Sequence, residues 1–241
     1  MGAVVEISGF VLAGGRSSRL GRDKALLPWP PNLFAEGNSQ TLLQHSIARL
    51  ESVCTTVSIC ANRDDLPFAE AIIPDALPGS GPLGGIVAAL EHSTTDWNLM
   101  LAVDLPVLPV EVLQALVACA RPGQESEAAS NLRSPQMVAC ILPEVDGLPQ
   151  PLCGLYHRVL VPGLRVALEA GTLKVMAALR VACDQVSADP EIQSASRGHR
   201  IKMWDAAAFA VLLPSAPDPS EWFLNINTPE DWQQAYQLRI R

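Results

Sequence analysis

The sequence predicts an α/β fold, a doubly wound and mostly parallel sheet flanked by helices. Three observations predict it. Strand-like apolar segments alternate with helix-like segments over the first 120 residues. Glycine-rich turns directly follow two of the strand-like segments. Hydrophobic residues make up 49% of the 241 residues, which is enough to bury a large core.

The expected strands are short apolar segments bounded by turn-forming residues. The first runs directly into a glycine-rich loop, and the fourth ends an apolar run at Asp104. The expected strands are residues 4–12, 56–61, 71–74, 98–103, 136–142, 152–156 and 222–224.

Helices are expected where apolar residues recur at helical spacing between capping signals. Thr228 fits the N-cap and Pro229 the first position of the last helix, and Gly171 fits a C-terminal stop. The expected helices are residues 41–52, 82–92, 109–120, 159–170, a short one around 204–212, and one that begins after Thr228.

We expect residues 1–241 to form a single domain with two insertions. Residues 28–40 contain three prolines and no periodicity, and residues 188–220 contain four prolines among mixed polar residues. The polar segment 121–127 is expected to be a surface loop.

Composition and charge restrict the possible partners and the compartment. The net charge of −8 and the pI near 5.0 argue against nucleic acid or an anionic membrane as a partner bound through general electrostatics. No apolar run reaches 18 residues, and the N-terminal segment lacks the basic start of a signal peptide. The six cysteines form no CxxC pair and the four histidines are far apart, which predicts reduced thiols, no zinc site and a cytoplasmic protein.

The loop at residues 12–24 is the most informative segment. Gly14 and Gly15 allow the backbone to approach a ligand closely and to present N–H groups to an anion. The loop supplies four cations within nine residues, namely Arg16, Arg19, Arg22 and Lys24. It matches neither a Walker A loop nor a dinucleotide fingerprint. It indicates a cradle for a polyphosphate, although a solvated basic turn is the alternative.

Polar residues follow three of the expected strands. Asn62, Asp75 and Asp104 each stand where a strand ends, and ligands of parallel sheets bind outside these carboxyl ends. Asp104 is placed to bind Mg²⁺ beside phosphates, or else to cap the following helix. Asn62 and Asp75 can equally be turn formers.

Four ordered motifs resemble those of the molybdenum cofactor guanylyltransferases, the MobA family. Residues 12–24 fill every fixed position of the signature L-A-G-G-x-S-x-R-x-G-x-D-K. Asp75 followed by Gly-Pro-Leu-Gly-Gly at 81–85, Val-Asp-Leu-Pro at 103–106, and Asn-Ile-Asn-Thr-Pro-Glu-Asp at 225–231 also match. The resemblance covers the chain except 28–40 and 188–220. The sequence departs from the family at Val103, where a cysteine is usual, and in the length of residues 188–220.

The resemblance implies a single nucleotidyltransferase domain with a Rossmann-like, nucleotide-diphospho-sugar transferase-like fold. The implied reaction is transfer of GMP from GTP to a molybdopterin-type molybdenum cofactor, with Mg²⁺ and with release of pyrophosphate. The implied partners are GTP, the molybdenum cofactor and proteins that handle or receive that cofactor, with neither nucleic acid nor a membrane.

The resemblance also implies roles for particular residues. The catalytic residues would be Lys24, Arg19 and Asp104. The nucleotide would be bound by Leu12, Ala13, Gly14, Gly15, Lys24, Asn62, Asp75, Gly81 and Asp104, with Asn62 and Asp75 at the base and ribose. Asp104 and Asn227 would hold the metal, and Asn225 would lie on the acceptor side, although both asparagines also suit simple turns.

Three alternative functions remain from the sequence. A cytidylyltransferase for the same cofactor or a sugar-phosphate nucleotidyltransferase would keep the fold, but Leu-Ala-Gly-Gly and Gly-Pro-Leu-Gly-Gly match the guanylyl group better. A non-catalytic nucleotide-binding protein is the third alternative. The presence of Arg19, Lys24 and Asp104 argues against it.

Overall fold

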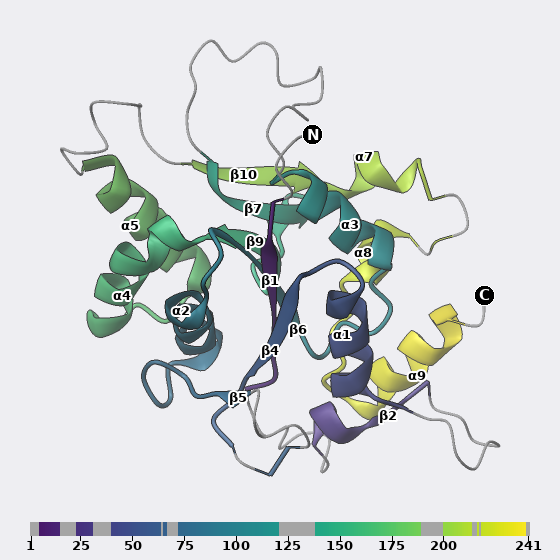
Figure 1. Ribbon diagram of the computed structural model, residues 1–241. Helices are drawn as coiled ribbons and strands as arrows, with labels where there is room; N and C mark the ends of the chain where they lie inside the picture. The colour runs from purple at the N-terminus through teal and green to yellow at the C-terminus, as the bar shows by residue number, and fades with distance from the viewer. Residues whose placement is uncertain are drawn as a thin grey trace.

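An eight-stranded, mostly parallel sheet lies at the centre of the fold, with helices on both faces (Figure 1). The computed structural model describes residues 5–14, 23–30, 40–63, 65–66, 72–120, 138–188, 200–213, 216 and 218–239. The strands of this sheet are β1 (Ile7–Leu12), β4 (Thr56–Cys60), β5 (Ile72–Ile73), β6 (Trp97–Ala102), β7 (Val138–Val145), β8 (Leu148–Pro149), β9 (Cys153–His157) and β10 (Arg200–Asp205). Their order is β10-β7-β9-β6-β1-β4-β5, with β8 paired to β7.

The parallel half of the sheet is organised around β1, whose six residues are all buried. β1 pairs in parallel with β4 on one side and β6 on the other, and β5 extends the parallel set beyond β4. The carboxyl ends of these four strands therefore meet at one edge of the sheet, as the sequence predicts. β9 runs antiparallel to both β6 and β7, and β10 is parallel to β7.

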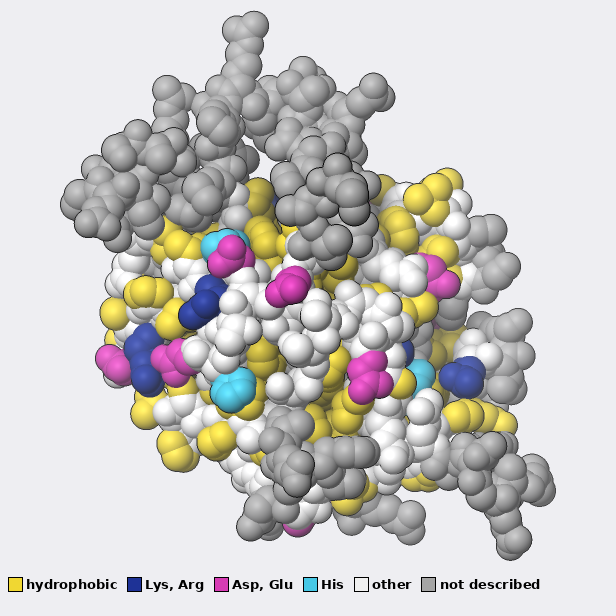
Figure 2. Space-filling view, in the orientation of Figure 1, with side chains coloured by type: hydrophobic (Ala, Val, Ile, Leu, Met, Phe, Trp, Pro, Cys, Tyr) yellow, Lys and Arg dark blue, Asp and Glu magenta, His cyan; other side chains and the backbone are white. Residues whose placement is uncertain are grey.

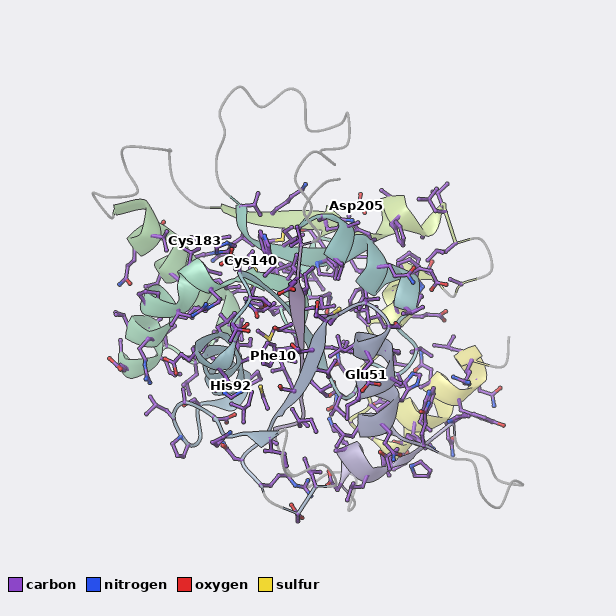
Figure 3. The ribbon with its side chains drawn as sticks, in the orientation of Figure 1. Phe10, Glu51, His92, Cys140, Cys183 and Asp205 are labelled. Atoms are coloured by element: carbon purple, nitrogen blue, oxygen red, sulfur yellow. The ribbon has the colours of Figure 1, made fainter. Side chains whose placement is uncertain are left out.

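Two hydrophobic cores flank the sheet. One lies beneath α1 (Leu42–Glu51), α3 (Val110–Ala118), α8 (Pro219–Trp222) and α9 (Pro229–Arg239). The other lies beneath α2 (Gly81–His92), α4 (Val161–Glu169) and α5 (Val175–Ala188), where Phe10 and Cys140 point inward (Figure 3). Because side chains alternate along a strand, Phe10 and its neighbour Val11 enter opposite cores.

Opposite charges lie side by side on the surface. Figure 2 shows acidic and basic side chains interspersed with hydrophobic and uncharged ones on this face. On α4, Arg165 Nε lies 3.0 Å from Glu91 Oε1 of α2, with both side chains solvent-accessible. Such exposed pairs contribute little to stability. Within the described ranges, the helices are too short or too polar to cross a bilayer.

The helices predicted near residues 41–52, 82–92, 109–120 and 159–170 are confirmed as α1 to α4. α1 begins with a capping box, because Thr41 Oγ1 accepts from Gln44 N (3.2 Å) and Gln44 Oε1 accepts from Thr41 N (2.7 Å). The same reciprocal pattern joins Thr228 and Asp231 at the start of α9, which confirms that N-cap. The short helix expected around 204–212 is α7 (Ala206–Ala210).

The two segments expected to be insertions are partly built into sheets. At the ends of 28–40, β2 (Pro28–Trp29) pairs antiparallel with β3 (Gln40–Thr41), and residues 31–39 lie outside the described part of the chain. Within 188–220, residues 200–205 form β10, an edge strand of the main sheet. The surface loop expected at 121–127 also falls outside the described residues.

Two elements differ from the sequence-based expectation. The strand expected at 222–224 is wrong, because Asp218 accepts from Ser220 N (2.9 Å) and Pro219 starts the helical turn α8, which buries Trp222. The sequence analysis also overlooked α5. Its buried residues Val175, Ala178, Leu179, Ala182 and Val186 follow the helical period.

Candidate functional site

A cavity of about 770 Å³ opens at the carboxyl ends of β1, β4, β5 and β6. The start of α2 and the short helix η1 (Lys24–Leu26) form further parts of its wall. Nine of the predicted site residues line it, namely Leu12, Ala13, Gly14, Lys24, Asn62, Asp75, Gly81, Asp104 and Asn227. The strand-end rule predicted that Asn62, Asp75 and Asp104 would meet here, and the other six residues were expected from the glycine-rich loop and the family resemblance.

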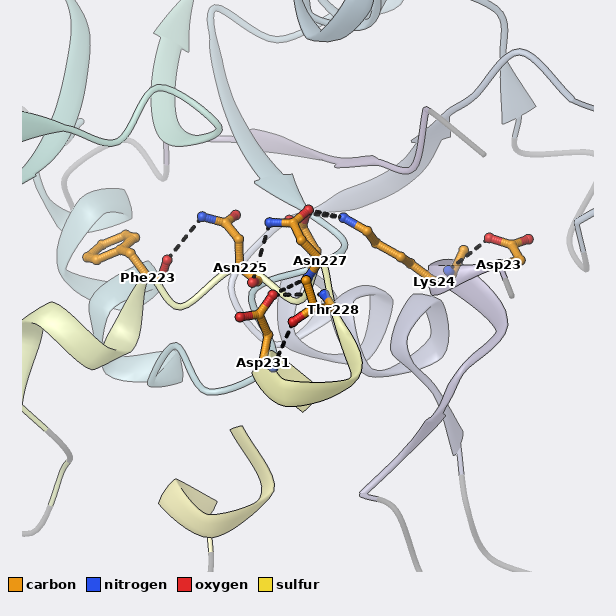
Figure 4. Close-up of polar contacts among 9 residues, drawn as sticks. Asp23, Lys24, Phe223, Asn225, Asn227, Thr228 and Asp231 are labelled. Atoms are coloured by element: carbon orange, nitrogen blue, oxygen red, sulfur yellow. Dashed lines mark hydrogen bonds and ion pairs between the residues drawn. The ribbon is translucent and has the colours of Figure 1, made fainter. Parts of the chain in front are cut away.

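Three predicted residues are not placed in the cavity wall. Gly15 and Arg19 lie outside the described residues. Asn225 is described but does not line the cavity. Its side-chain amide donates to the Phe223 carbonyl at 3.2 Å (Figure 4).

The Lys24 ammonium contacts two side-chain oxygen atoms at one end of the cavity, and Figure 4 shows it facing Asn227. Nζ lies 3.1 Å from Asp104 Oδ2 and donates to Asn227 Oδ1 at 2.6 Å. The side chains of Lys24 and Asp104 are only 17% and 19% exposed, so their ion pair is partly shielded from water. A carboxylate oxygen and an amide oxygen thus already converge on one cation.

The segment that carries Asn227 is fixed by Asp231. Asp231 Oδ2 accepts from the backbone N–H groups of Asn227 and Thr228, each at 2.8 Å. These hydrogen bonds, of which the one from Asn227 has the largest effect, hold the pKa of Asp231 below its usual range. The carboxylate therefore stays ionised and holds the turn ahead of α9, where the N-terminal end of the helix also favours negative charge.

The turn that carries Lys24 is held by Asp23 and by Arg63, a residue that the sequence analysis did not single out. Asp23 Oδ1 accepts from Ala25 N at 3.0 Å, and Asp23 Oδ2 forms an ion pair with Arg63 Nη1. The Arg63 guanidinium also binds Asp65 through Nε (2.6 Å) and Nη2 (2.8 Å). The hydrogen bonds that the guanidinium donates to Asp65, and then those to Asp23, raise the pKa of Arg63. The available signal was the run Asn-Arg-Asp-Asp that follows the second strand.

At the other end of the cavity, Asn62 and Asp75 bind each other. Asn62 Nδ2 donates to Asp75 Oδ2 at 2.5 Å, and the Asp75 backbone N–H donates to Asn62 Oδ1 at 2.7 Å. Burial raises the pKa of Asp75, while the hydrogen bond from Asn62 acts in the opposite direction. Burial, reinforced by Asp75, also raises the pKa of the adjacent Cys60 thiol to about 12, so this thiol is not a nucleophile.

Two glycines let α2 approach this end of the cavity. A Cβ at Gly84 would lie 2.9 Å from Ser80 Cβ and 3.2 Å from Asp75 Cβ. Gly81 adopts a φ of +59°, a conformation that side chains other than glycine rarely adopt. The missing side chain of Gly84 therefore allows the helix to lie close to Asp75.

The fold is that of the nucleotidyltransferases. A crystal structure of molybdopterin-guanine dinucleotide biosynthesis protein A from Archaeoglobus fulgidus superposes with a TM-score of 0.66 at 21% identity, covering 97% of this chain and 98% of that one. A 2-C-methyl-D-erythritol 4-phosphate cytidylyltransferase from Thermus thermophilus gives a TM-score of 0.54 at 13% identity, covering 96% and 98%.

The family follows from the sequence comparisons. The model of the MobA-like NTP transferase domain matches residues 9–182. A probable molybdenum cofactor guanylyltransferase of Chloroflexus aggregans is 30% identical over 236 residues, which is 95% of this chain and 94% of that protein. The molybdenum cofactor guanylyltransferase of Vibrio cholerae is 32% identical over 176 residues, or 71% and 75% of the two chains. The chain belongs to the MobA-like NTP transferase family.

We expect Gly14→Ala to weaken nucleotide binding and Gly84→Ala to lower the stability of the fold. A Cβ at Gly14 would meet no atom of the described residues within 4 Å, and Gly14 is part of the cavity wall, so the added methyl group would occupy space beside the ligand. Gly14→Ala should therefore leave the melting temperature unchanged and weaken nucleotide binding roughly tenfold, or about 1.4 kcal/mol. Gly84→Ala should instead lower the free energy of unfolding by about 1–3 kcal/mol, because the helix and the Asp75 loop must move apart.

The measurements are urea unfolding and calorimetric titration with nucleotide on both variants. Each variant is the control for the other. Normal nucleotide binding by Gly14→Ala would show that the ligand does not approach this part of the backbone.

Proposed function

We propose that this protein transfers GMP from GTP to a molybdopterin-type molybdenum cofactor and releases pyrophosphate. The observation that carries the proposal is the convergence of Lys24, Asp104 and Asn227 at one end of the strand-end cavity. Relatives named as molybdenum cofactor guanylyltransferases, one of which aligns with 95% of the chain, supply the reaction and the acceptor.

The reaction requires charge neutralisation more than activation of a nucleophile. The terminal phosphate of the acceptor is already ionised near neutral pH, so no Ser, Cys or His has to lose a proton. The enzyme must hold two anions in line and stabilise the charge that develops at the α-phosphoryl group and on the leaving pyrophosphate. A cavity with a lysine, a carboxylate and exposed backbone at Gly14 suits that task.

Asp104 and Asn227 are the residues that would hold Mg²⁺. Their side-chain oxygens already face a single cation, the Lys24 ammonium, and hard oxygen donors are the ligands that Mg²⁺ takes in proteins. Mg²⁺ bound there would neutralise charge on the phosphates. Lys24 would then give up both contacts and direct its ammonium to phosphate oxygens.

The nucleoside would lie toward Asn62 and Asp75. Asp75 Oδ1 makes no hydrogen bond among the described residues, and a carboxylate suits either a ribose hydroxyl or the N1–H and amine of guanine. Arg19 and Gly15 would complete the phosphate side. Asn225 would face the acceptor only if its amide left the Phe223 carbonyl.

We extend the proposal to the cellular compartment, the domain organisation and the partner proteins. The six cysteines are free thiols, which supports a cytoplasmic protein. We also place the whole chain in one nucleotidyltransferase domain, with proteins that handle or receive the cofactor as its partners.

Asp104→Asn should nearly abolish pyrophosphate release while the melting curve stays close to that of the wild type. Asn keeps the shape and can still face Lys24, but it removes the charge that a hard cation requires. The assay is Mg²⁺-dependent pyrophosphate release with GTP and the cofactor. Asp96→Asn, at the opposite end of the same strand, is the matched control and should be fully active. Full activity of Asp104→Asn would show that the metal is held elsewhere.

GTP should bind more tightly than CTP, ATP or UTP by orders of magnitude. A base without a donor for Asp75 Oδ1 leaves this oxygen of a half-buried carboxylate unpaired. Calorimetric titration with the four nucleotides measures this directly. Equal or tighter binding of CTP would favour a cytidylyltransferase on the same fold.

Lys24→Ala should reduce kcat by roughly 10²–10³-fold and affect GTP binding less, because its charge counts most as negative charge develops on the leaving group. Initial rates over a range of GTP concentrations separate the two effects. If only KM rises, Lys24 is a ground-state phosphate anchor.

A further inference from the structure

A buried cation on α1 is the feature that the proposed reaction leaves unexplained. Arg49 is only 8% exposed, because it lies on the helix face that also buries Leu42 and Leu50. Its Nη1 donates to the Leu105 carbonyl at 2.8 Å, whereas Nε and Nη2 are buried and have no hydrogen-bond partner in the part of the chain that the structure describes. No carboxylate of the described ranges pairs with it, and burial lowers the pKa of Arg49 to about 10.

Such an arrangement is unfavourable for stability. A buried charge loses hydration, and unpaired N–H groups add to that cost. An apolar side chain of similar length would pack against the same core without either penalty. Among the described residues, the backbone acceptor that Arg49 reaches is the Leu105 carbonyl, directly after Asp104, and its Nη1 also lies 3.4 Å from His45 Nε2. We infer that this contact compensates for the cost.

His45 lies one helical turn before Arg49 and binds the next carbonyl of the same turn. Gln40 Nε2 lies 3.1 Å from His45 Nδ1, and His45 Nε2 lies 3.1 Å from the Pro106 carbonyl. An amide NH₂ can only donate, so Nδ1 accepts and Nε2 carries the proton that is donated to Pro106. Burial, with Arg49 nearby, lowers the pKa of His45 to about 4, so the ring is neutral near pH 7.

A third donor completes the set. The Ile226 backbone N–H, directly before Asn227, donates to the Asp104 carbonyl at 3.0 Å. Three consecutive carbonyl oxygens, those of Asp104, Leu105 and Pro106, are therefore held by Ile226, Arg49 and His45. The turn that carries the Asp104 carboxylate has little freedom to shift relative to Asn227.

We propose that Arg49 and His45 are positioning residues, which hold the Asp104 turn so that its carboxylate stays aligned with Asn227 for a divalent cation. This inference rests on the proposed function. It explains why α1 keeps a buried cation where an apolar residue would pack better. Residues that orient metal ligands in this way typically change metal affinity or activity by about 10–100-fold when they are replaced.

Arg49→Met is the decisive variant. If Arg49 positions the Asp104 turn, this variant should lose metal affinity and activity without losing stability. It removes the buried charge and fills the same volume, so its melting temperature should equal or exceed that of the wild type. Its half-saturating Mg²⁺ concentration should rise about tenfold and its kcat should fall about 10–100-fold. Arg49→Lys keeps one donor and should lie between Arg49→Met and the wild type. Arg165→Met, which removes an exposed arginine from α4, should match the wild type in both respects.

A readout without catalysis keeps this test independent of the proposed reaction. Mn²⁺ titration in the presence of a non-hydrolysable GTP analogue, followed by electron paramagnetic resonance, should show about tenfold weaker Mn²⁺ binding by Arg49→Met. His45→Phe, which lacks the donor to Pro106, should shift it the same way. If the wild type binds Mn²⁺ but transfers no GMP, the proposed function fails while the positioning role is still measured.

Three results would overturn the inference. One is a folded Arg49→Met variant with wild-type Mg²⁺ dependence, Mn²⁺ affinity and kcat. Another is the loss of folding in both Arg49→Met and Arg49→Lys, which would make the role of Arg49 structural. The last is a wild-type protein that binds no Mn²⁺ with the nucleotide analogue.

Discussion

The contacts that the Lys24 ammonium makes with Asp104 and Asn227 are the interactions on which the rest of the site depends. The ammonium binds Asp104, 80 residues later in the sequence, and Asn227, 203 residues later. The surrounding contacts fix the three segments that meet there. Asp23 and Arg63 hold the turn of Lys24, donors from α1 hold the turn of Asp104, and Asp231 holds the segment of Asn227. The Lys24 ammonium thus balances the charge of the Asp104 carboxylate and binds the neutral amide oxygen of Asn227 at the same time.

The residues that could be predicted are those whose positions follow from chain direction. Asn62, Asp75 and Asp104 each end an apolar strand, and parallel strands end at the same edge of a sheet. Local pattern and one topological rule were therefore sufficient to bring them together. The parallel half of the sheet and α1 to α4 were predictable for the same reason, because their periodicity and caps are local signals.

The remainder depends on tertiary contacts that leave no local signal. An arginine on a helix is ordinarily exposed, so the sequence does not show that Arg49 is buried or that Arg63 joins two loops. Trp222 and Phe223 resemble a strand, but Asp218 and Pro219 impose a helical turn on them. β9 runs antiparallel between its neighbours, and a single apolar segment does not indicate its direction.

The parallel pairing around β1 also determines when the protein can work. Ser8 of β1 is in register with Thr56 of β4 and with Asn98 of β6. Strands that are far apart in the sequence must therefore meet before this half of the sheet can form. Such long-range pairings form slowly during folding. On the ribosome, Lys24 and Asp104 are synthesised long before Asn227, and the Asp104 turn lacks its Ile226 contact until then. The candidate site is therefore among the last parts of the newly made chain to mature.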